Sequence, residues 1–308
     1  MTVSVIMNCY NSAAHLRDAL DSVFSQTFTD WEIVFWDNCS VDDSAAIAKS
    51  YGPRVRYFRA ETTTPLGAAR NLALEHATGN YLAFLDCDDE WLPTKLEKQV
   101  ALFEANPQVG LVCTDTEMFS QQGTLSCLFA TASPVRGHVF RELMKQQWIS
   151  MSSAMLRKEA LESLDHWFDE SLSMCEEADV FYRIAKTWEL DHVAEPLSRW
   201  RVHEVNTTFR KFGAFADETL VILAKHRQLY PNYDQDYPDL VTLLSRRAAF
   251  QKAVALWREG RGAQARAWIR PWQDSMKHRL FWLASWIPGR YFDPLARLYF
   301  KLPGFLRR

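Results

Sequence analysis

The chain has 308 residues, and 35 Lys and Arg against 38 Asp and Glu give it a formal net charge of −3. Hydrophobic residues make up 48% of the sequence and charged residues 24%, values that are typical of globular proteins and exclude a disordered or collagen-like chain. The mild acidic balance also argues against general nucleic-acid binding, because that function needs a basic surface to neutralise phosphates.

The charge is spread unevenly along the chain. Residues 271–308 carry a net charge of +5 and nine of the 41 aromatic residues, so residues 1–270 carry −8. Trp and Tyr mixed with Lys and Arg suit a membrane interface with anionic head groups. We therefore expect the basic aromatic tail, residues 279–308, to contact a membrane surface. The alternative is a helical appendage whose aromatic side chains pack on protein.

Other features of the sequence indicate the compartment. The six cysteines include no C-x-x-C pair, and several lie in apolar runs, which favours free thiols in a reducing compartment. The N-terminus shows no secretory signal, and no run of about 18 apolar residues predicts a transmembrane helix. The expectation is a cytoplasmic protein, peripheral on the inner face of the membrane.

Strand and helix signals alternate over the first hundred residues. Short apolar runs predict strands, and apolar residues at helical spacing predict the helices that follow them. The strands are expected at 3–7, 32–36, 55–58 and 81–85, and the helices at 16–24, 42–51, 67–77 and 93–105. Ser12 is the expected N-cap of the first helix. The alternation indicates an α/β protein with a mostly parallel sheet covered on both faces.

The later part of the chain changes character. The patterns predict strands at 109–113 and 197–202 and a helix between them at 178–188. From residue 213 onward the chain is mostly helical, with a helical hairpin formed by residues 248–257 and 263–268. We expect an α/β domain over residues 1–208 and a helical C-terminal region over 209–308.

Acidic residues follow two of the expected strands directly. The second strand runs into Asp37, and the fourth runs into the cluster of Asp86, Asp88 and Asp89. Ligands of open α/β sheets bind at the carboxyl ends of the strands, so both groups should lie on one edge of the sheet. Three carboxylates in four residues repel one another unless they share a cation, and oxygen ligands suit Mg²⁺ or Mn²⁺. A solvated acidic turn is the alternative.

A second group of polar residues lies late in this part of the chain. Glu176, Glu177 and Asp179 open a predicted helix, where the helix dipole alone would favour acidic residues. Arg201 and His203 are two residues apart on a predicted strand and therefore share a face.

Several motifs in fixed order resemble glycosyltransferase family 2, whose members have the GT-A fold. The resemblance covers roughly residues 2–208. The motifs are an opening strand and Y-N turn at 4–11, S-x-x-x-Q-T at 22–27, a W-E and D-x-x-S-x-D block at 31–42, A-R-N at 69–71, D-x-D-D at 86–89, an E-E-x-D block at 176–183 and R-x-H at 201–203.

This resemblance implies transfer of a sugar from a nucleotide-sugar to an acceptor hydroxyl with inversion. It implies that Asp88, supported by Asp86 and with His203 as a further ligand, binds Mn²⁺ or Mg²⁺ through the diphosphate. It places the general base at Glu177, where the family usually has Asp. Glu176 and Asp179 are the alternative bases. The resemblance also implies a nucleotide-sugar site formed by Tyr10, Asn11, Asp37, Arg70, Asp86, Arg201 and His203.

The expected function is therefore metal-dependent glycosyl transfer, with a UDP-sugar as the favoured donor and a lipid-linked or polysaccharide glycan as acceptor. Two alternatives remain. One is a catalytically inactive nucleotide-sugar-binding protein, favoured by Glu at position 177. The other is a sugar-nucleotide nucleotidyltransferase, which would need a Gly-rich, basic first loop that residues 8–11 do not provide.

Overall fold

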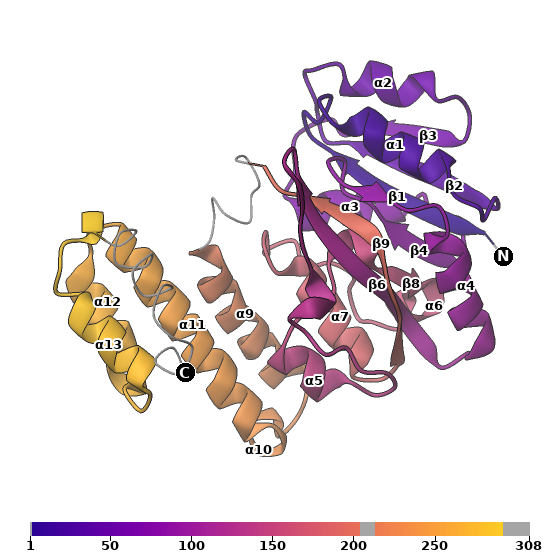
Figure 1. The fold of residues 1–308 in the computed structure, drawn as a ribbon. Helices are drawn as coiled ribbons and strands as arrows, with labels where there is room; N and C mark the ends of the chain where they lie inside the picture. The colour runs from indigo at the N-terminus through magenta and orange to yellow at the C-terminus, as the bar shows by residue number, and fades with distance from the viewer. Residues whose placement is uncertain (1, 204–212, 292–308) are drawn as a thin grey trace. The chain divides into compact units, whose positions relative to one another are not determined.

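The computed structural model describes residues 2–203 and 213–291 (Figure 1). The chain divides into two compact units, Met1–Glu204 and Val205–Arg308. The first unit contains the described strands, and the described part of the second is helical. The domain boundary expected at residue 208 lies outside the described residues.

One sheet, with nine strands in the described part of the chain, forms the centre of the first unit. The strand order is β3-β2-β1-β4-β8-β6-β9-β5, and β7 pairs with β6. The strands are β1 (Val3–Cys9), β2 (Trp31–Asp37), β3 (Val55–Arg59), β4 (Tyr81–Phe84), β5 (Glu90–Trp91), β6 (Val109–Ser120), β7 (Gly123–Cys127), β8 (Met155–Arg157) and β9 (Glu189–Arg201). β1 to β4 are mutually parallel, and β9 is parallel to β6, whereas β8 runs antiparallel between β4 and β6. The predicted mostly parallel sheet is confirmed.

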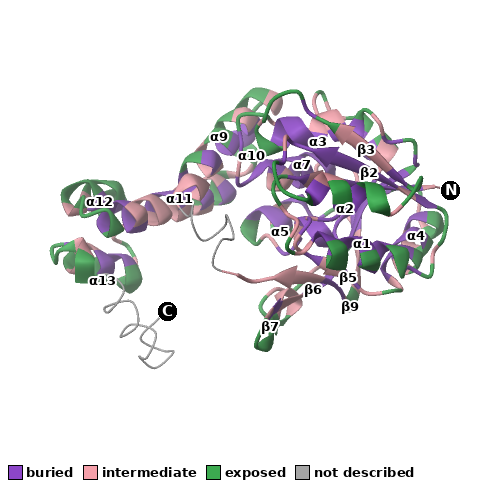
Figure 2. Ribbon diagram, turned by 90° about the horizontal axis from the view of Figure 1, so that it is seen from above, coloured by how far each residue is buried: buried purple, intermediate pink, exposed green. Residues whose placement is uncertain are grey.

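Helices cover both faces of this sheet, as predicted. They are α1 (Leu16–Phe24), α2 (Ser44–Ser50), α3 (Leu66–Leu74), α4 (Lys95–Ala105), α5 (Phe140–Lys145), α6 (Lys158–Glu162) and α7 (Glu176–Ala185). Val3 and Val5 of β1 share one core with Leu20 of α1 and Leu96 of α4. α3 and α7 lie on the other side of the strands from α1 and α2 (Figure 2). The strands are buried because apolar side chains on both of their faces meet a helix.

The predicted elements differ from the observed ones mainly at their ends. β6 and β9 extend well beyond the predicted runs because they pair with each other from Val109 to Phe119 and from Glu189 to Arg201. The cap predicted at Ser12 is wrong: α1 begins at Leu16, and the Ser12 hydroxyl donates to the Tyr10 carbonyl oxygen. Pairing partners and turns override local signals at these positions.

The described part of the second unit contains five α-helices. They are α9 (Ala214–Leu229), α10 (Tyr233–Asp236), α11 (Pro238–Arg258), α12 (Gly262–Ile269) and α13 (Met276–Ala284). α11 and α12 form the predicted hairpin, and Gly260 in their connection has φ +78°, a conformation that glycine adopts without strain. Trp257, Ile269 and Phe281 join in a separate core. Within the described residues, no helix combines the length and apolar character needed to cross a membrane.

Candidate active site

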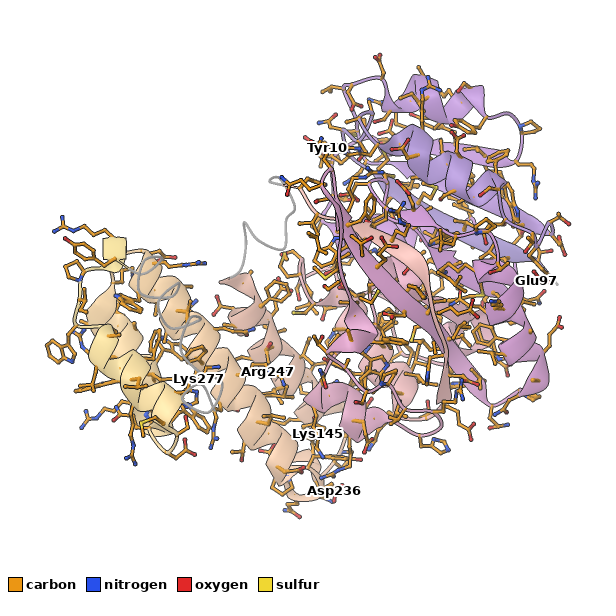
Figure 3. The ribbon with its side chains drawn as sticks, in the orientation of Figure 1. Tyr10, Glu97, Lys145, Asp236, Arg247 and Lys277 are labelled. Atoms are coloured by element: carbon orange, nitrogen blue, oxygen red, sulfur yellow. The ribbon has the colours of Figure 1, made fainter. Side chains whose placement is uncertain are left out.

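The carboxyl ends of β1, β2 and β4 meet at one edge of the sheet, because β1 pairs in parallel with both neighbours. Tyr10 and Asn11 follow β1, Asp37 ends β2, and Asp86 follows β4. The predicted meeting of the two acidic groups at one edge is confirmed. Tyr10, labelled in Figure 3, is 56% exposed, so its ring is available to a ligand at this edge.

Arg70 of α3 joins residues that are far apart in the sequence. Its guanidinium lies 2.5 Å from Glu176 Oε1, 3.5 Å from Asp86 Oδ1 and 3.8 Å from Glu177 Oε2. Arg70 itself is only 4% exposed. A buried Arg keeps its charge and holds several carboxylates through its planar set of donors. The aspartate loop after β4 and the first turn of α7 are therefore joined through one cation.

The start of α7 explains why three acidic residues gather there. Glu176, Glu177 and Asp179 occupy its first turn, where the unsatisfied backbone N–H groups and the helix dipole favour negative charge. The next turn adds Arg183, whose guanidinium lies 2.8 Å from Asp179 and donates to the carbonyl oxygens of His166 and Trp167. Asp179 is thus held against the loop before α7.

The three candidate bases differ in access. The side chains of Glu176 and Asp179 are 2% and 0% exposed, whereas that of Glu177 is 27% exposed. Burial and then the charge of Glu176 raise the pKa of Glu177 to about 8. A base with a pKa near the working pH is well matched to proton abstraction. Glu177 is therefore the candidate with both access and a suitable pKa.

This raised pKa predicts a pH profile. A general base works only when deprotonated, so kcat/KM should fall about tenfold for each pH unit below about 8. The measurement is the initial rate at limiting donor and acceptor between pH 5 and pH 9. An acid limb near pH 4.5, the ordinary value for a glutamic acid, would contradict the assignment.

The loop after β4 is fixed to the end of β9. Asp89 accepts hydrogen bonds from the Ser152 hydroxyl at 2.6 Å and from the Arg201 backbone N–H at 3.0 Å. The Arg201 Nε donates to the Asp88 carbonyl oxygen at 2.9 Å, and Asp88 Oδ2 lies 3.0 Å from His203 Nε2. Asp89, which is 3% exposed, is therefore a positioning residue that brings His203 to Asp88.

Arg201 has further partners on its own unit. Its guanidinium pairs with Asp18 at 3.0 Å and with Glu90. These contacts direct the side chain to the loop, and its predicted contact with a diphosphate stays a prediction.

Sequence reasoning missed Ser152 and His15 of this region, and it gave Asp89 only as one acid of the cluster. Ser152 and Asp89 brace the loop, and the His15 ring lies with its centroid 5.7 Å from that of His203. Burial and the nearby Arg201 charge lower the pKa of His15, so its ring loses its proton at a lower pH than an ordinary histidine. No sequence pattern signals Ser152 or His15. His15 lies just before α1 and Ser152 lies in a short turn before β8, so it is the tertiary fold that places them beside the loop.

The predicted metal ligands Asp86, Asp88 and His203 do not form a closed cage. In the part of the chain that the structure describes, no three or more His, Cys, Asp or Glu side chains are placed to hold a metal ion. Asp88 and His203 lie side by side, while Asp86 faces Arg70. A carboxylate and an imidazole fit Mn²⁺, and the remaining positions suit phosphate oxygens and water. The donor set therefore fits a cation held jointly with a diphosphate.

Asp37 has a structural role at this edge of the sheet. It is fully buried, and its carboxylate accepts from the Ser40 backbone N–H at 2.7 Å, the Tyr57 hydroxyl at 2.5 Å and Arg59 at 3.1 Å. Asn11 joins the same turn, since its side-chain oxygen accepts from the Val41 N–H at 2.8 Å. Both residues hold the loops at this edge, and direct contact of Asp37 with a nucleotide base stays a prediction.

Residues 4–164 match the model of glycosyl transferase family 2. The chain belongs to glycosyl transferase family 2. The resemblance of the sequence motifs to this family is thereby confirmed, and the protein is a glycosyltransferase.

Two relatives illustrate the match in sequence. EpsE of Bacillus subtilis (strain 168), named as a glycosyltransferase, is 28% identical over 218 residues, which cover 62% of this chain and 78% of EpsE. The UDP-Glc:alpha-D-GlcNAc-diphosphoundecaprenol beta-1,3-glucosyltransferase WfgD of Escherichia coli is 34% identical over 105 residues, covering 34% of this chain and 42% of WfgD.

Solved structures agree on the fold. S. aureus TarS matches with a TM-score of 0.68 at 18% identity, over 96% of this chain and 53% of that one. The mannosyltransferase PcManGT from Pyrobaculum calidifontis, solved with GDP-Man and Mn²⁺, matches with a TM-score of 0.62 at 17% identity, over 97% and 88% of the two chains. The predicted α/β fold of the GT-A type is confirmed.

Proposed function

We propose that this glycosyltransferase is metal-dependent and inverting, and that it moves a sugar from a UDP-sugar to a hydroxyl of a lipid-linked or polysaccharide glycan. The observation that carries the proposal is the buried Arg70, which joins Asp86 of the aspartate loop to Glu176 and Glu177. Asp86, on the side of the proposed diphosphate leaving group, and Glu177, the proposed base, thus both lie close to the Arg70 guanidinium. We assign catalysis to residues 1–208 and an accessory role to the helical region 209–308.

The charge balance at this edge supports a divalent cation. Seven carboxyl groups lie around the two arginines at this edge: Asp86, Glu176 and Glu177 near Arg70, and Asp18, Asp88, Asp89 and Glu90 near Arg201. A dianionic diphosphate would add to this excess of negative charge. Asp88, Asp86 and His203 would hold Mn²⁺ or Mg²⁺, which would supply positive charge to offset the negative charge of the departing diphosphate.

Glu177 performs the proton transfer in this proposal. Its carboxylate takes the proton of the acceptor hydroxyl as the hydroxyl oxygen forms a bond to the anomeric carbon. The bond from that carbon to the diphosphate breaks on the opposite face, and the nucleoside diphosphate leaves with its electron pair. Glu176, ion-paired with Arg70, orients the site, and Asp179 anchors the helix through Arg183.

Relatives support the choice of donor and acceptor. A structural neighbour, TarS 1–349, was solved in complexes with UDP and with UDP-GlcNAc, and WfgD is named for a UDP-Glc donor and a diphosphoundecaprenol-linked acceptor. PcManGT was solved with GDP-Man, so a guanosine donor is the second choice. A lipid-linked acceptor would place the enzyme at the cytoplasmic face of a membrane.

A donor screen tests this function. The protein is incubated with UDP-, dTDP- or GDP-sugars, Mn²⁺ and a detergent-solubilised lipid-linked glycan, and free nucleotide and glycosylated lipid are measured together. We expect one molecule of UDP to be released for each molecule of lipid that is glycosylated. Binding of a donor without any release would favour an inactive binding protein. Formation of UTP in a parallel incubation of UDP-sugar with added pyrophosphate would favour a nucleotidyltransferase.

A further inference from the structure

The outer face of α13 is apolar although it faces solvent. Met276, Leu280 and Leu283 are four and three residues apart, so they form one stripe along the helix. They are 62%, 42% and 59% exposed. The opposite face is buried through His278 and Phe281, and Phe281 joins the core of the second unit. Apolar side chains thus lie on the exposed side of this helix as well as on its buried side, whereas a surface helix normally turns a polar face to water.

The apolar surface continues past the end of the helix. Trp286 and Ile287 are 63% and 40% exposed, and Tyr291 is 45% exposed. We refer to Met276, Leu280, Leu283, Trp286, Ile287 and Tyr291 as the α13 surface. Figure 2 shows exposed residues along the helix beside its buried face. An exposed apolar patch of this kind marks a contact with a membrane or another molecule.

Cations border the α13 surface on both sides. Each helical residue turns about 100°, so Lys277 and Arg279 flank the stripe on opposite sides. The Lys277 ammonium lies 4.5 Å from the centroid of the Phe250 ring, and Arg279 Nε donates to the Gln273 carbonyl oxygen at 2.7 Å. Lys277 is labelled in Figure 3. In the described part of the chain, neither Lys277 nor Arg279 forms a salt bridge with a carboxylate.

The sequence around this surface has almost no negative charge. Residues 275–291 contain no Asp or Glu, and they contain Lys277, Arg279 and Arg290. Residues 292–308, which lie outside the described residues and include the apolar run at 295–302, add four Lys and Arg against one Asp. A second copy of this chain would bring like charges together, whereas anionic head groups would complement them.

We propose that the α13 surface docks on an anionic lipid bilayer, with Met276, Leu280 and Leu283 entering the head-group region and the flanking cations contacting lipid phosphates. Apolar side chains between cations are the pattern of helices that lie in the membrane interface. This inference goes beyond the proposed sugar transfer and does not depend on it. The sequence predicts membrane contact for the tail, residues 279–308, and the proposal places that contact on the α13 surface.

Sedimentation with vesicles tests this docking. The full chain is mixed with vesicles of phosphatidylglycerol and phosphatidylcholine, or of phosphatidylcholine alone, and bound protein is measured after centrifugation. We expect binding to the anionic vesicles, at least a tenfold weaker association for L280E/L283E, and a similar loss for K277E/R279E. Val221→Glu changes an exposed apolar residue of α9 and should bind like the wild type.

Two controls make the result decisive. Circular dichroism and the donor-induced rise in melting temperature should be unchanged in L280E/L283E, which shows that the variant is folded. Wild-type sedimentation that equals that of L280E/L283E, or that needs no anionic lipid, would overturn the proposal. A change from oligomer to monomer in L280E/L283E without a change in vesicle binding would assign the surface to a second copy instead. Because the readout is lipid binding, an inactive protein would still give a clear answer.

Discussion

Glu177→Gln should lower kcat by about 10²- to 10⁴-fold while donor affinity stays within about threefold of the wild type. The amide keeps the size of the side chain and its place in the first turn of α7, but it does not accept the proton of the acceptor hydroxyl. Turnover is measured as nucleoside diphosphate release, and donor affinity by calorimetric titration. Loss of turnover together with retained binding identifies a base.

Two matched variants accompany this test. Glu159→Gln removes an exposed carboxylate from α6 and should leave turnover unchanged. Asp179→Asn removes the alternative base and acts on the anchor formed with Arg183, so its main effect should be on stability. Full activity of Glu177→Gln combined with a loss in Asp179→Asn at unchanged stability would move the base to Asp179.

Replacing Arg70 by Met should abolish turnover and destabilise the fold. Arg70 and Glu176 are both almost fully buried and lie 2.5 Å apart, and Glu176 Oε2 has no hydrogen-bond partner among the described residues. Removing one partner of a buried ion pair costs about 3–5 kcal/mol, because the other charge is left uncompensated. For a domain of this size that loss corresponds to a fall of about 10 °C in Tm, measured by calorimetry.

A double variant separates the two effects. R70M/E176M also removes the buried Glu176 carboxylate and leaves only the more exposed Asp86 and Glu177 without Arg70, so Tm should recover by more than half while turnover stays lost. Lys98→Met breaks an exposed pair with Glu195 and should change stability by about 1 kcal/mol or less. A Tm for Arg70→Met that equals that of Lys98→Met would contradict the buried ion pair as the link between α3 and α7.

The order of strands and helices could be predicted from the sequence because local patterns encode it. Continuous apolar runs such as residues 3–7 mark strands buried on both faces, and the residues after them mark the functional edge of the sheet. The full lengths of β6 and β9 could not be predicted, since their polar ends are ordered by pairing with each other. The cap at Ser12 failed for a related reason: a turn uses its hydroxyl.

The sequence motifs single out individual residues at this edge of the sheet, but not the contacts between them. The motifs single out Arg70 and Glu176, yet their contact spans 106 positions in the chain and is set by tertiary packing. The same holds for Asp89, which looks like one more acid in a cluster but is buried between Ser152 and Arg201. Asp37 differs from these residues. The sequence predicts that its carboxylate contacts a ligand, whereas in the structure the carboxylate accepts hydrogen bonds from Tyr57 and Arg59.

Metal-dependent donor binding at Asp88 tests the central claim most directly. Calorimetric titration of a UDP-sugar into the wild type, Asp88→Asn and the exposed control Asp165→Asn is run with and without Mn²⁺. We expect binding by the wild type and by Asp165→Asn that weakens at least tenfold without Mn²⁺, and binding by Asp88→Asn that is equally weak in both conditions. Binding by Asp88→Asn that is as tight and as metal-dependent as that of the wild type, or no binding of any nucleotide-sugar by the wild type, would contradict the account.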